Sequence, residues 1–282
     1  MKNIENIELE GKNGRPILCD LRFDEKGKDQ SLIIFCHGFK GFKDWGHFNL
    51  IADQLVKNGF IVLKFNFSHN GGTMEEPIDF SDLEAFGEND FIKELNDIEV
   101  VLNDVENGFV SKKLVNWNKK TFLIGHSRGG GVAILKANED PRIHKVVSWA
   151  GVSDLLNSLP NSRNLKRWKE SGVYWMKNSR TYQDMPMYYN FVEILYANKE
   201  RLDIKSACEG LKIPQLIIHG SSDESVSFLE GKKLQSWNRD AVFFEIESAG
   251  HTFGGKHPFE ETSLPEHSKI MVEKTTEFLN AQ

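Results

Sequence analysis

The chain has 282 residues, of which 39% are hydrophobic and 27% charged, a balance typical of a globular protein with a substantial core. Its 35 basic and 41 acidic side chains give a net charge of −6 without a long run of one sign, which excludes a strongly basic surface for nucleic acid or anionic membrane. No stretch has the pattern of a signal peptide or a membrane span, and three widely spaced cysteines make a disulfide framework improbable. We therefore expect a cytoplasmic protein that binds neither nucleic acid nor membrane.

Strand-like and helix-like segments alternate in the first half of the chain. Continuous apolar runs predict buried strands, hydrophobic residues every three or four positions predict helices, and the turn-forming residues 11–16 predict an antiparallel hairpin at one edge of a sheet. The elements expected here are strands at 7–10, 17–23, 31–36, 60–67, 121–124 and 144–150, helices at 48–58, 89–106 and 130–138, and a loop at 68–87.

The alternation stops at residues 152–210, which lack a clear strand and are rich in Trp, Tyr and Met. This segment is too long for a simple crossover, so we expect a largely helical cap. Alternation resumes with strands at 214–219 and 242–246 and helices at 227–237 and 266–279. The expected fold class is therefore α/β, a mostly parallel doubly wound sheet formed by residues 1–151 and 211–282 with a cap inserted at 152–210.

Residues 125–129, GHSRG, fit the pattern G-x-S-x-G between a predicted strand and a predicted helix. In that setting Ser127 lies at the tip of a tight turn, and the start of the following helix directs its amide groups and positive dipole end toward the serine. An isolated G-x-S-x-G also occurs in turns without chemistry, but the strand before it and the helix after it favour a nucleophile. Ser127 is therefore the candidate nucleophile.

A serine nucleophile at neutral pH needs a base, and the base needs an orienting acid. Asp223 follows the predicted strand 214–219, and His251 follows the predicted strand 242–246. Because the carboxyl ends of parallel strands meet at one edge of a sheet, these side chains are expected to lie near Ser127, in the chain order serine, acid, histidine.

Other residues could take these roles. Glu224 and Asp154 are alternative acids, and His257 is an alternative base. Asp223 could equally be a turn or helix-capping residue, and His251 a surface loop residue. Position directly after a strand favours Asp223 and His251.

An oxyanion hole needs two backbone N–H groups directed at the developing negative charge. One would come from Arg128, the residue after the nucleophile, and the other from Phe39 in the loop after strand 31–36. No His-Glu-x-x-His sequence, Cys/His metal spacing or phosphate-binding glycine motif is present, so we expect no metal and no cofactor.

Several further side chains are candidates for substrate binding or for support. His69 could line the pocket, and aromatic and sulfur-containing residues of the cap could either line it or pack against the core. The substrate-binding candidates are His69, Trp175, Tyr182 and Met185. The histidines expected to steady loops or pack beneath the turn are His37, His126 and His219.

Four motifs, HGFKG (37–41), GHSRGG (125–130), IHGSSDESV (218–226) and SAGHTF (248–253), together resemble the α/β-hydrolase superfamily over nearly the whole chain. Within it the sequence is similar to capped bacterial serine esterases of the cinnamoyl- and feruloyl-esterase-like group, and to serine aminopeptidase-like and dienelactone-hydrolase-like proteins. The resemblance implies a Ser127–His251–Asp223 triad with Phe39 and Arg128 as oxyanion donors. The sequence departs from the last group, whose nucleophile is cysteine, and from related esterases at residues 64–72, which replace an R-x-D-x-x-G-H-G-x-S-like segment.

The expected function is a serine hydrolase that cleaves carboxylic esters of small or aromatic substrates through an acyl-enzyme. One alternative is a peptidase or aminopeptidase, which would need an acidic group in the cap to bind the substrate amine. The candidates for that group are Glu170, Asp184 and Glu193. Another alternative is a binding module without turnover. The expected partner is a small-molecule ester, and the sequence leaves the oligomeric state open.

Overall fold

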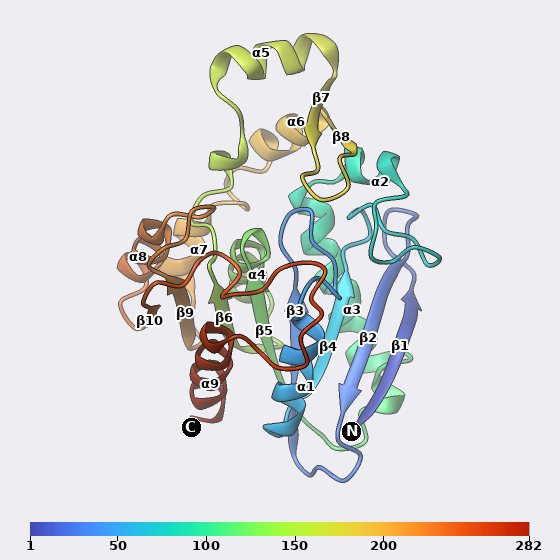
Figure 1. Ribbon diagram of the computed structural model, residues 1–282, viewed down its shortest axis with the longest axis vertical. Helices are drawn as coiled ribbons and strands as arrows, with labels where there is room; N and C mark the ends of the chain where they lie inside the picture. Colours follow the sequence, from blue (N-terminus) through green and yellow to red (C-terminus); the bar gives the residue numbers. More distant parts are fainter. Residues whose placement is uncertain (282) are drawn as a thin grey trace.

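The computed structural model describes residues 1–281 and is built around an eight-stranded sheet (Figure 1). The strand order is β1-β2-β4-β3-β5-β6-β9-β10, with β1 and β2 antiparallel to their neighbours and the remaining strands parallel. The strands are β1 (Lys2–Leu9), β2 (Ile17–Phe23), β3 (Gln30–Cys36), β4 (Ile61–Asn66), β5 (Trp117–His126), β6 (Ile143–Trp149), β9 (Gln215–Gly220) and β10 (Val242–Ile246).

Helices cover both faces of this sheet. The α-helices are α1 (Phe48–Lys57), α2 (Leu83–Glu88), α3 (Phe91–Asn107), α4 (Arg128–Glu139), α5 (Ser162–Ser171), α6 (Asn190–Ala197), α7 (Ile204–Gly210), α8 (Phe228–Trp237) and α9 (Glu266–Asn280). Two short 3₁₀ turns lie at Ser111–Lys113 and Leu156–Ser158.

The strand period of two divides the apolar residues between two hydrophobic cores. In β3, Leu32 and Ile34 pack into the core under α3, α4 and α7, whereas Ile33 and Phe35 pack into the core under α1 and α9. The continuous apolar run at residues 32–36 therefore has both faces buried, as a central parallel strand requires. The predicted α/β class with a doubly wound, mostly parallel sheet is confirmed.

Most elements begin and end within a few residues of their expected bounds. β10 has the expected bounds, while β1 begins five residues and β5 four residues before the expected starts. The expectation of a loop throughout 68–87 is wrong, because α2 occupies its end. Asp82 caps this helix, since its Oδ1 accepts a hydrogen bond of 2.9 Å from the Ala85 amide.

Residues 152–210, the segment expected to form the cap and called the cap segment below, place α5, a hairpin of two strands and α6 above one end of the sheet (Figure 1). The expectation that this segment lacks strands is wrong: β7 (Val173–Lys177) and β8 (Asp184–Tyr188) form the antiparallel hairpin between α5 and α6. The last helix of the segment, α7, lies against α4 and α8 beside the sheet. Residues 152–210 therefore combine helices with a two-stranded ribbon.

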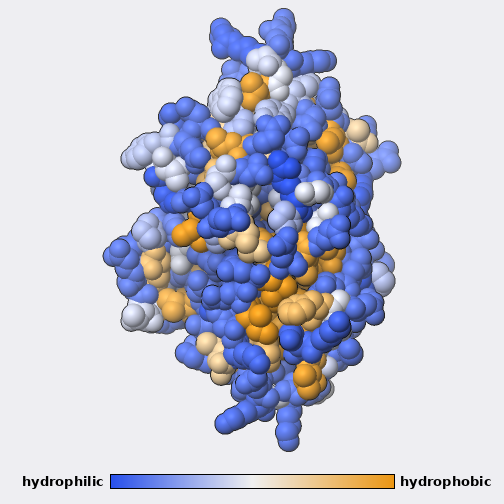
Figure 2. Space-filling view, turned by 90° about the vertical axis from the view of Figure 1, so that its right-hand side faces the viewer, coloured by the Kyte–Doolittle hydropathy of each residue, from blue (hydrophilic) through white to orange (hydrophobic). Residues whose placement is uncertain are grey.

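The hairpin is joined to the core side by polar contacts. The Tyr188 hydroxyl donates to Glu84 of α2 at 2.5 Å, and Arg180 pairs with Asp79 at 3.0 Å. Figure 2 shows mostly hydrophilic residues at the cap end of one face and hydrophobic residues gathered lower down. Within residues 1–281, no helix has both the length and the apolar character needed to cross a bilayer.

Candidate active site

Ser127 lies in the turn between β5 and α4. Its backbone has φ 57° and ψ −124°, a conformation that side-chain-bearing residues rarely adopt. The Ser127 amide donates to the Trp149 carbonyl at 2.9 Å, which ties the turn to β6. A Cβ on Gly125 would lie 2.1 Å from the Gly129 carbonyl oxygen, so the turn can close only because that position has no side chain.

Asp223 and His251 meet beside this turn. Asp223 follows β9, His251 follows β10, and the ring Nδ1–H of His251 donates to Asp223 Oδ2 at 2.9 Å. The Asp223 side chain is completely buried, and its Oδ1 accepts from the Ser225 and Val226 amides at 2.9 and 2.8 Å. Burial alone would raise the pKa of Asp223, but hydrogen bonds from His219, His251 and Val226 outweigh it and hold that pKa well below its usual value. Asp223 is therefore a charged acceptor that fixes the tautomer and orientation of the His251 ring.

Two further histidines support this pair: His219, expected only to steady a loop, and His126, expected only to pack beneath the turn. His219, completely buried at the end of β9, lies with Nε2 3.4 Å from Asp223 Oδ2 and donates to the Val226 carbonyl at 2.9 Å. The ring of His126 donates through Nε2 to the His251 carbonyl at 2.9 Å, and burial lowers the pKa of His126 to about 3. The sequence offered one signal that His219 supports Asp223: it lies at the end of a predicted strand, four residues before that acid.

The alternative acids and base are not paired with one another or with the two residues of this pair. Glu224 is exposed, and Asp154 accepts from the Leu156 amide at 2.8 Å. His257 lies near the site, but its Nδ1 accepts a hydrogen bond of 2.9 Å from the Gly46 amide. The carboxylate–imidazole pair found at the sheet edge is the one between Asp223 and His251.

The loop after β3 runs beside Ser127. A Cβ on Gly38 would lie 3.0 Å from the Ser127 Cβ, so Phe39 follows a point of close approach to the turn. His37 holds this loop: its Nε2 accepts from the Phe67 amide at 3.2 Å, and its Nδ1–H donates to the Gly38 carbonyl at 2.8 Å. Burial lowers the pKa of His37 to about 4, so the ring is neutral and can serve as donor and acceptor together.

Arg128, the first residue of α4, joins the elbow to the same loop through its side chain. Its guanidinium lies 4.6 Å from the ring centre of Phe39 and 5.3 Å from that of Phe91, and it pairs with the buried carboxylate of Glu94. These contacts link the two residues whose amides were predicted to form the oxyanion hole.

Two cavities meet at Ser127, and Phe39, Ser127 and Ser225 line both. We call the first, of about 430 Å³, the polar cavity. It is lined by Gly38, Phe39, Lys40, Gly41, Trp45, Phe48, His126, Ser127, Asn178, Ser179, Arg180, Ser225, His251, Thr252 and His257. We call the second, of about 400 Å³, the apolar cavity. It is lined by Phe39, Phe91, Ser127, Arg128, Val152, Asp154, Leu155, Asn157, Met176, Met187, Phe191, Ser225, Val226, Ser227 and Glu230.

None of the four substrate-binding candidates is among the described residues that line either cavity. Trp175 and Tyr182 are 56% and 77% exposed, and Met185 is fully buried. His69 is buried with its Nδ1 2.8 Å from the Ser68 hydroxyl, which also bonds to Asp97. The cap contributes other residues instead, among them Met176, Met187 and Phe191 to the apolar cavity.

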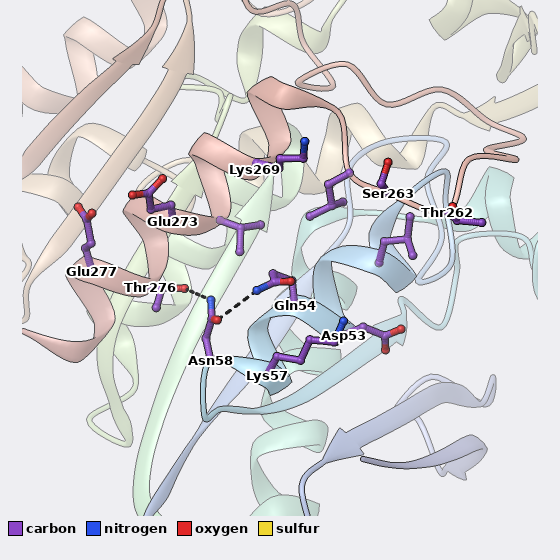
Figure 3. Close-up of a pocket in the computed structure, with 13 residues that line it drawn as sticks. Asp53, Gln54, Lys57, Asn58, Thr262, Ser263, Lys269, Glu273, Thr276 and Glu277 are labelled. Carbon is purple, nitrogen blue, oxygen red and sulfur yellow. Dashed lines mark hydrogen bonds between the residues drawn. The ribbon is translucent and has the colours of Figure 1, made fainter.

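A larger cavity of about 780 Å³ lies away from Ser127, between α1 and α9 (Figure 3). Asn58 crosses it, donating to Thr276 at 2.9 Å and accepting from Gln54 at 3.2 Å. Of the described residues that line it, none is a histidine or cysteine. Residues 1–281 also contain no group of three His, Cys, Asp or Glu side chains placed to hold a metal ion.

Comparisons with known proteins identify a family and a fold. A model of the prolyl oligopeptidase family matches residues 47–261, which include Ser127, Asp223 and His251. A comparison with curated proteins finds no significant match.

Solved structures resemble the chain over nearly its whole length. Est1E from Butyrivibrio proteoclasticus, with bound ferulic acid, has a TM-score of 0.71 at 17% identity, and 97% of each chain is covered. A putative hydrolase from Agrobacterium vitis S4 has a TM-score of 0.70 at 17% identity, with 99% of each chain covered. A monoacylglycerol lipase from Paleococcus ferrophilus has a TM-score of 0.66 at 17% identity, covering 93% of this chain and 98% of the lipase. The fold is thus that of the α/β hydrolases.

Proposed function

The chain belongs to the prolyl oligopeptidase family, and we propose that it is a serine hydrolase that cleaves carboxylic esters of small or aromatic substrates. The observation that carries the proposal is the 2.9 Å hydrogen bond between His251 and Asp223, beside a cavity that His251 shares with the strained Ser127. A buried carboxylate, an imidazole and a serine on a tight turn are the groups that acyl transfer requires.

In the proposed reaction, His251 accepts the Ser127 proton while the serine oxygen attacks the ester carbonyl carbon. The carbon becomes tetrahedral, and the backbone N–H groups of Phe39 and Arg128 hold the resulting oxyanion. Asp223 stabilises the imidazolium and keeps Nε2 directed at the serine. The side chains of Arg128 and His37 keep the two donor amides in position.

The ester bond to the alcohol then breaks, and His251 gives its proton to the leaving oxygen. Water enters, His251 takes a proton from it, and the hydroxyl attacks the acyl-enzyme carbonyl. The carboxylic acid leaves as the proton returns to Ser127, so the enzyme is regenerated without a cofactor.

The size and lining of the apolar cavity support small or aromatic acyl groups. Phe91, Met187 and Phe191 form buried walls of it, and about 400 Å³ is enough for a small acyl group. Est1E, of the same fold, carries ferulic acid in its solved structure.

A peptidase activity is the second candidate, and the family name supports it. The acidic groups first considered for binding a substrate amine, Glu170, Asp184 and Glu193, are exposed and do not line the described part of either cavity. Asp154 and Glu230 do line the apolar cavity and are better placed for that role. Turnover of aminoacyl amides compared with esters of the same acyl group separates the two activities.

Labelling with a fluorophosphonate probe tests the nucleophile. We expect stoichiometric labelling of the wild-type protein, loss of labelling in Ser127→Ala, and labelling slowed by orders of magnitude in His251→Ala. The variant Ser225→Ala is the matched control, because Ser225 lines the same two cavities. Undiminished labelling of Ser127→Ala would refute the assignment.

A further inference from the structure

The two cavities at Ser127 differ in charge. Two cationic side chains, Lys40 and Arg180, line the polar cavity, and no carboxylate is among its described lining residues. The apolar cavity carries the carboxylates Asp154 and Glu230 on walls that are otherwise mostly hydrophobic, and its one described cation, Arg128, is paired with the buried carboxylate of Glu94. An ester bound across Ser127 therefore meets opposite electrostatic environments on its two sides.

The position of His251 decides which side holds the alcohol. As the general acid, His251 must reach the oxygen of the leaving alcohol, within about 3 Å in the reacting complex. His251 lines the polar cavity and is not among the described residues of the apolar one. The alcohol part of the substrate consequently lies in the polar cavity and the acyl part in the apolar cavity.

Lys40 offers free donors to that alcohol. Its ammonium donates to the Lys177 carbonyl at 2.9 Å, and no ion pair joins it to a carboxylate within residues 1–281. An ammonium has three donors, so two are left for a ligand. The side chain is half-buried, where a charge is less screened than in bulk water.

Arg180 reaches the same cavity from the turn of the β7–β8 hairpin. One of its terminal nitrogens donates to the Ile78 carbonyl at 3.3 Å and to Asp79 at 3.0 Å. Asp79 is itself exposed and is not among the described residues of the polar cavity, so it only partly offsets the charge. The remaining guanidinium donors keep the planar geometry that suits a carboxylate.

We propose that the substrate is an ester of an apolar acid with an alcohol that carries a carboxylate, the carboxylate being bound by Lys40 and Arg180. This inference rests on the proposed ester hydrolysis at Ser127 and adds the class of leaving group. An acylated hydroxy acid has this composition.

Two pairs of synthetic esters test the assignment. The first pair, 4-carboxyphenyl butyrate and 4-carbamoylphenyl butyrate, differs in the charge of the leaving group at nearly constant size. The second pair, mono-4-nitrophenyl succinate and 4-nitrophenyl butyrate, places the charge on the acyl part instead. We expect the wild-type kcat/KM to favour the charged ester about tenfold in the first pair and to disfavour it about tenfold in the second.

Variants show whether the two cations cause the preference. In the double variant Lys40→Gln/Arg180→Gln, the ratio of kcat/KM for the charged ester to kcat/KM for the neutral ester of the first pair should fall about tenfold. The chemical reactivity of the two esters is the same for every variant, so it does not contribute to this change. Lys177→Gln is the matched control, because Lys177 is an exposed cation of the same hairpin that pairs with Asp184 and does not line the described cavity. Its ratio should stay within twofold of wild type.

The variant Asp79→Asn shows whether the preference depends on the charge of Arg180 or on the role of Arg180 in anchoring the hairpin. It removes the ion pair that ties Arg180 to residue 79 but leaves both cations, so the ratio should rise by about twofold or more if charge is decisive. If anchoring of the hairpin is decisive, the ratio should fall as in the double variant, and the inference is overturned. This variant also keeps the inference testable if the double variant does not fold.

The outcomes distinguish this inference from the function on which it rests. Hydrolysis of both members of the first pair with a ratio that does not change in the double variant overturns the anionic leaving group and leaves the serine hydrolase intact. A preference for the succinate overturns the assignment of the two cavities. Absence of turnover with every ester, together with absence of fluorophosphonate labelling, overturns both proposals.

Discussion

The edge of the sheet and the cap segment line the same cavities, but they are held in place by different interactions. Ser127, Asp223 and His251 follow β5, β9 and β10 at the same edge of the sheet, with β6 between β5 and β9, and hydrogen bonds to backbone groups hold the turns that carry them. The β7–β8 hairpin packs Met185 and Met187 into the core, but the polar contacts that join it to the core are largely exposed, such as those of Arg180 with Asp79 and Tyr188 with Glu84. Exposed contacts of this kind contribute about 0–1 kcal/mol each.

This difference indicates which positions should tolerate substitutions. The groups proposed to carry the chemistry lie on strand ends, where a small displacement would disturb several buried contacts at once. Arg180 and Met176, two of the residues proposed to select the substrate, lie on the β7–β8 hairpin, whose polar contacts are weaker and more independent. We therefore expect substitutions at the sheet edge to have the larger effects.

The largest effect is expected for Asp223→Asn. An amide in this position donates to His251 instead of accepting from it, which leaves the imidazole in the wrong tautomer, and kcat should fall about ten-thousandfold. Ester hydrolysis under saturating substrate measures it. Glu224→Gln, at the exposed neighbouring carboxylate, should change kcat less than twofold, and an equal loss there would contradict the assignment of the acid.

The next effect is on stability and compares one glycine from each region. In Gly125→Ala the new methyl group would meet the Gly129 carbonyl oxygen, so urea unfolding should show a loss of about 3 kcal/mol or more. In Gly172→Ala, within the cap segment, the methyl group has open space, and the φ of 76° costs only about 1 kcal/mol. Equal losses in the free energy of unfolding for the two variants would show that the two regions tolerate an added methyl group equally.

A third test uses pH, because the cap segment contains no histidine. Burial lowers the pKa of His37 to about 4 and that of His126 to about 3, so the unfolded chain takes up protons more readily than the folded chain between pH 6.5 and 4. Acid should therefore reduce the free energy of unfolding, by about 2 kcal/mol or more between pH 7.5 and 5 in urea titrations.

Asp97 opposes this trend and provides the control. Burial raises its pKa to about 7 against hydrogen bonds from Ser68, so the folded chain binds that proton first and gains stability as the pH falls. Asp97→Asn removes the gain, and its stability should fall more steeply with acid than that of wild type. A shallower fall in this variant would contradict the protonation states assigned here.

The smallest effect is expected in the cap segment itself and compares two neighbours on β7. Met176→Ala enlarges the apolar cavity, so hydrolysis of the octanoate ester of nitrophenol should gain about threefold to tenfold in kcat/KM relative to the butyrate ester. Trp175→Ala changes a side chain that is 56% exposed and lines neither cavity in its described part, so the ratio should not change. The opposite result would restore Trp175 as a substrate-binding residue.

The sheet could be predicted from the sequence because its central strands contain short continuous apolar runs, such as residues 32–36 in β3, that differ clearly from the pattern of amphipathic helices. The pairing of Asp223 with His251 followed from one geometrical rule, that parallel strands end at a common edge. No feature of the cap offered such a rule. β8 has the sequence DMPMY, with a proline at position 186 and no β-branched residue, so it lacks the usual composition of a strand.

The cap residues that line the cavities could not be predicted from the sequence, for a related reason. Strand alternation places Met176 toward the apolar cavity and leaves Trp175 exposed, but the side that faces the cavity depends on how the hairpin packs. Helix α2, by contrast, could have been predicted from the sequence, because Asp82 lies in the N-capping position before Leu83–Glu88.

His37 sets a constraint on natural variants of this chain. Its ring satisfies one amide of the segment after β4 and one carbonyl of the segment after β3, so it joins two loops across the top of adjacent strands. A replacement must present an acceptor and a donor together, which among uncharged side chains of similar reach only the carboxamides of asparagine and glutamine can do. Homologues without histidine at this position should therefore carry an amide there, or show compensating changes at residues 38 and 67.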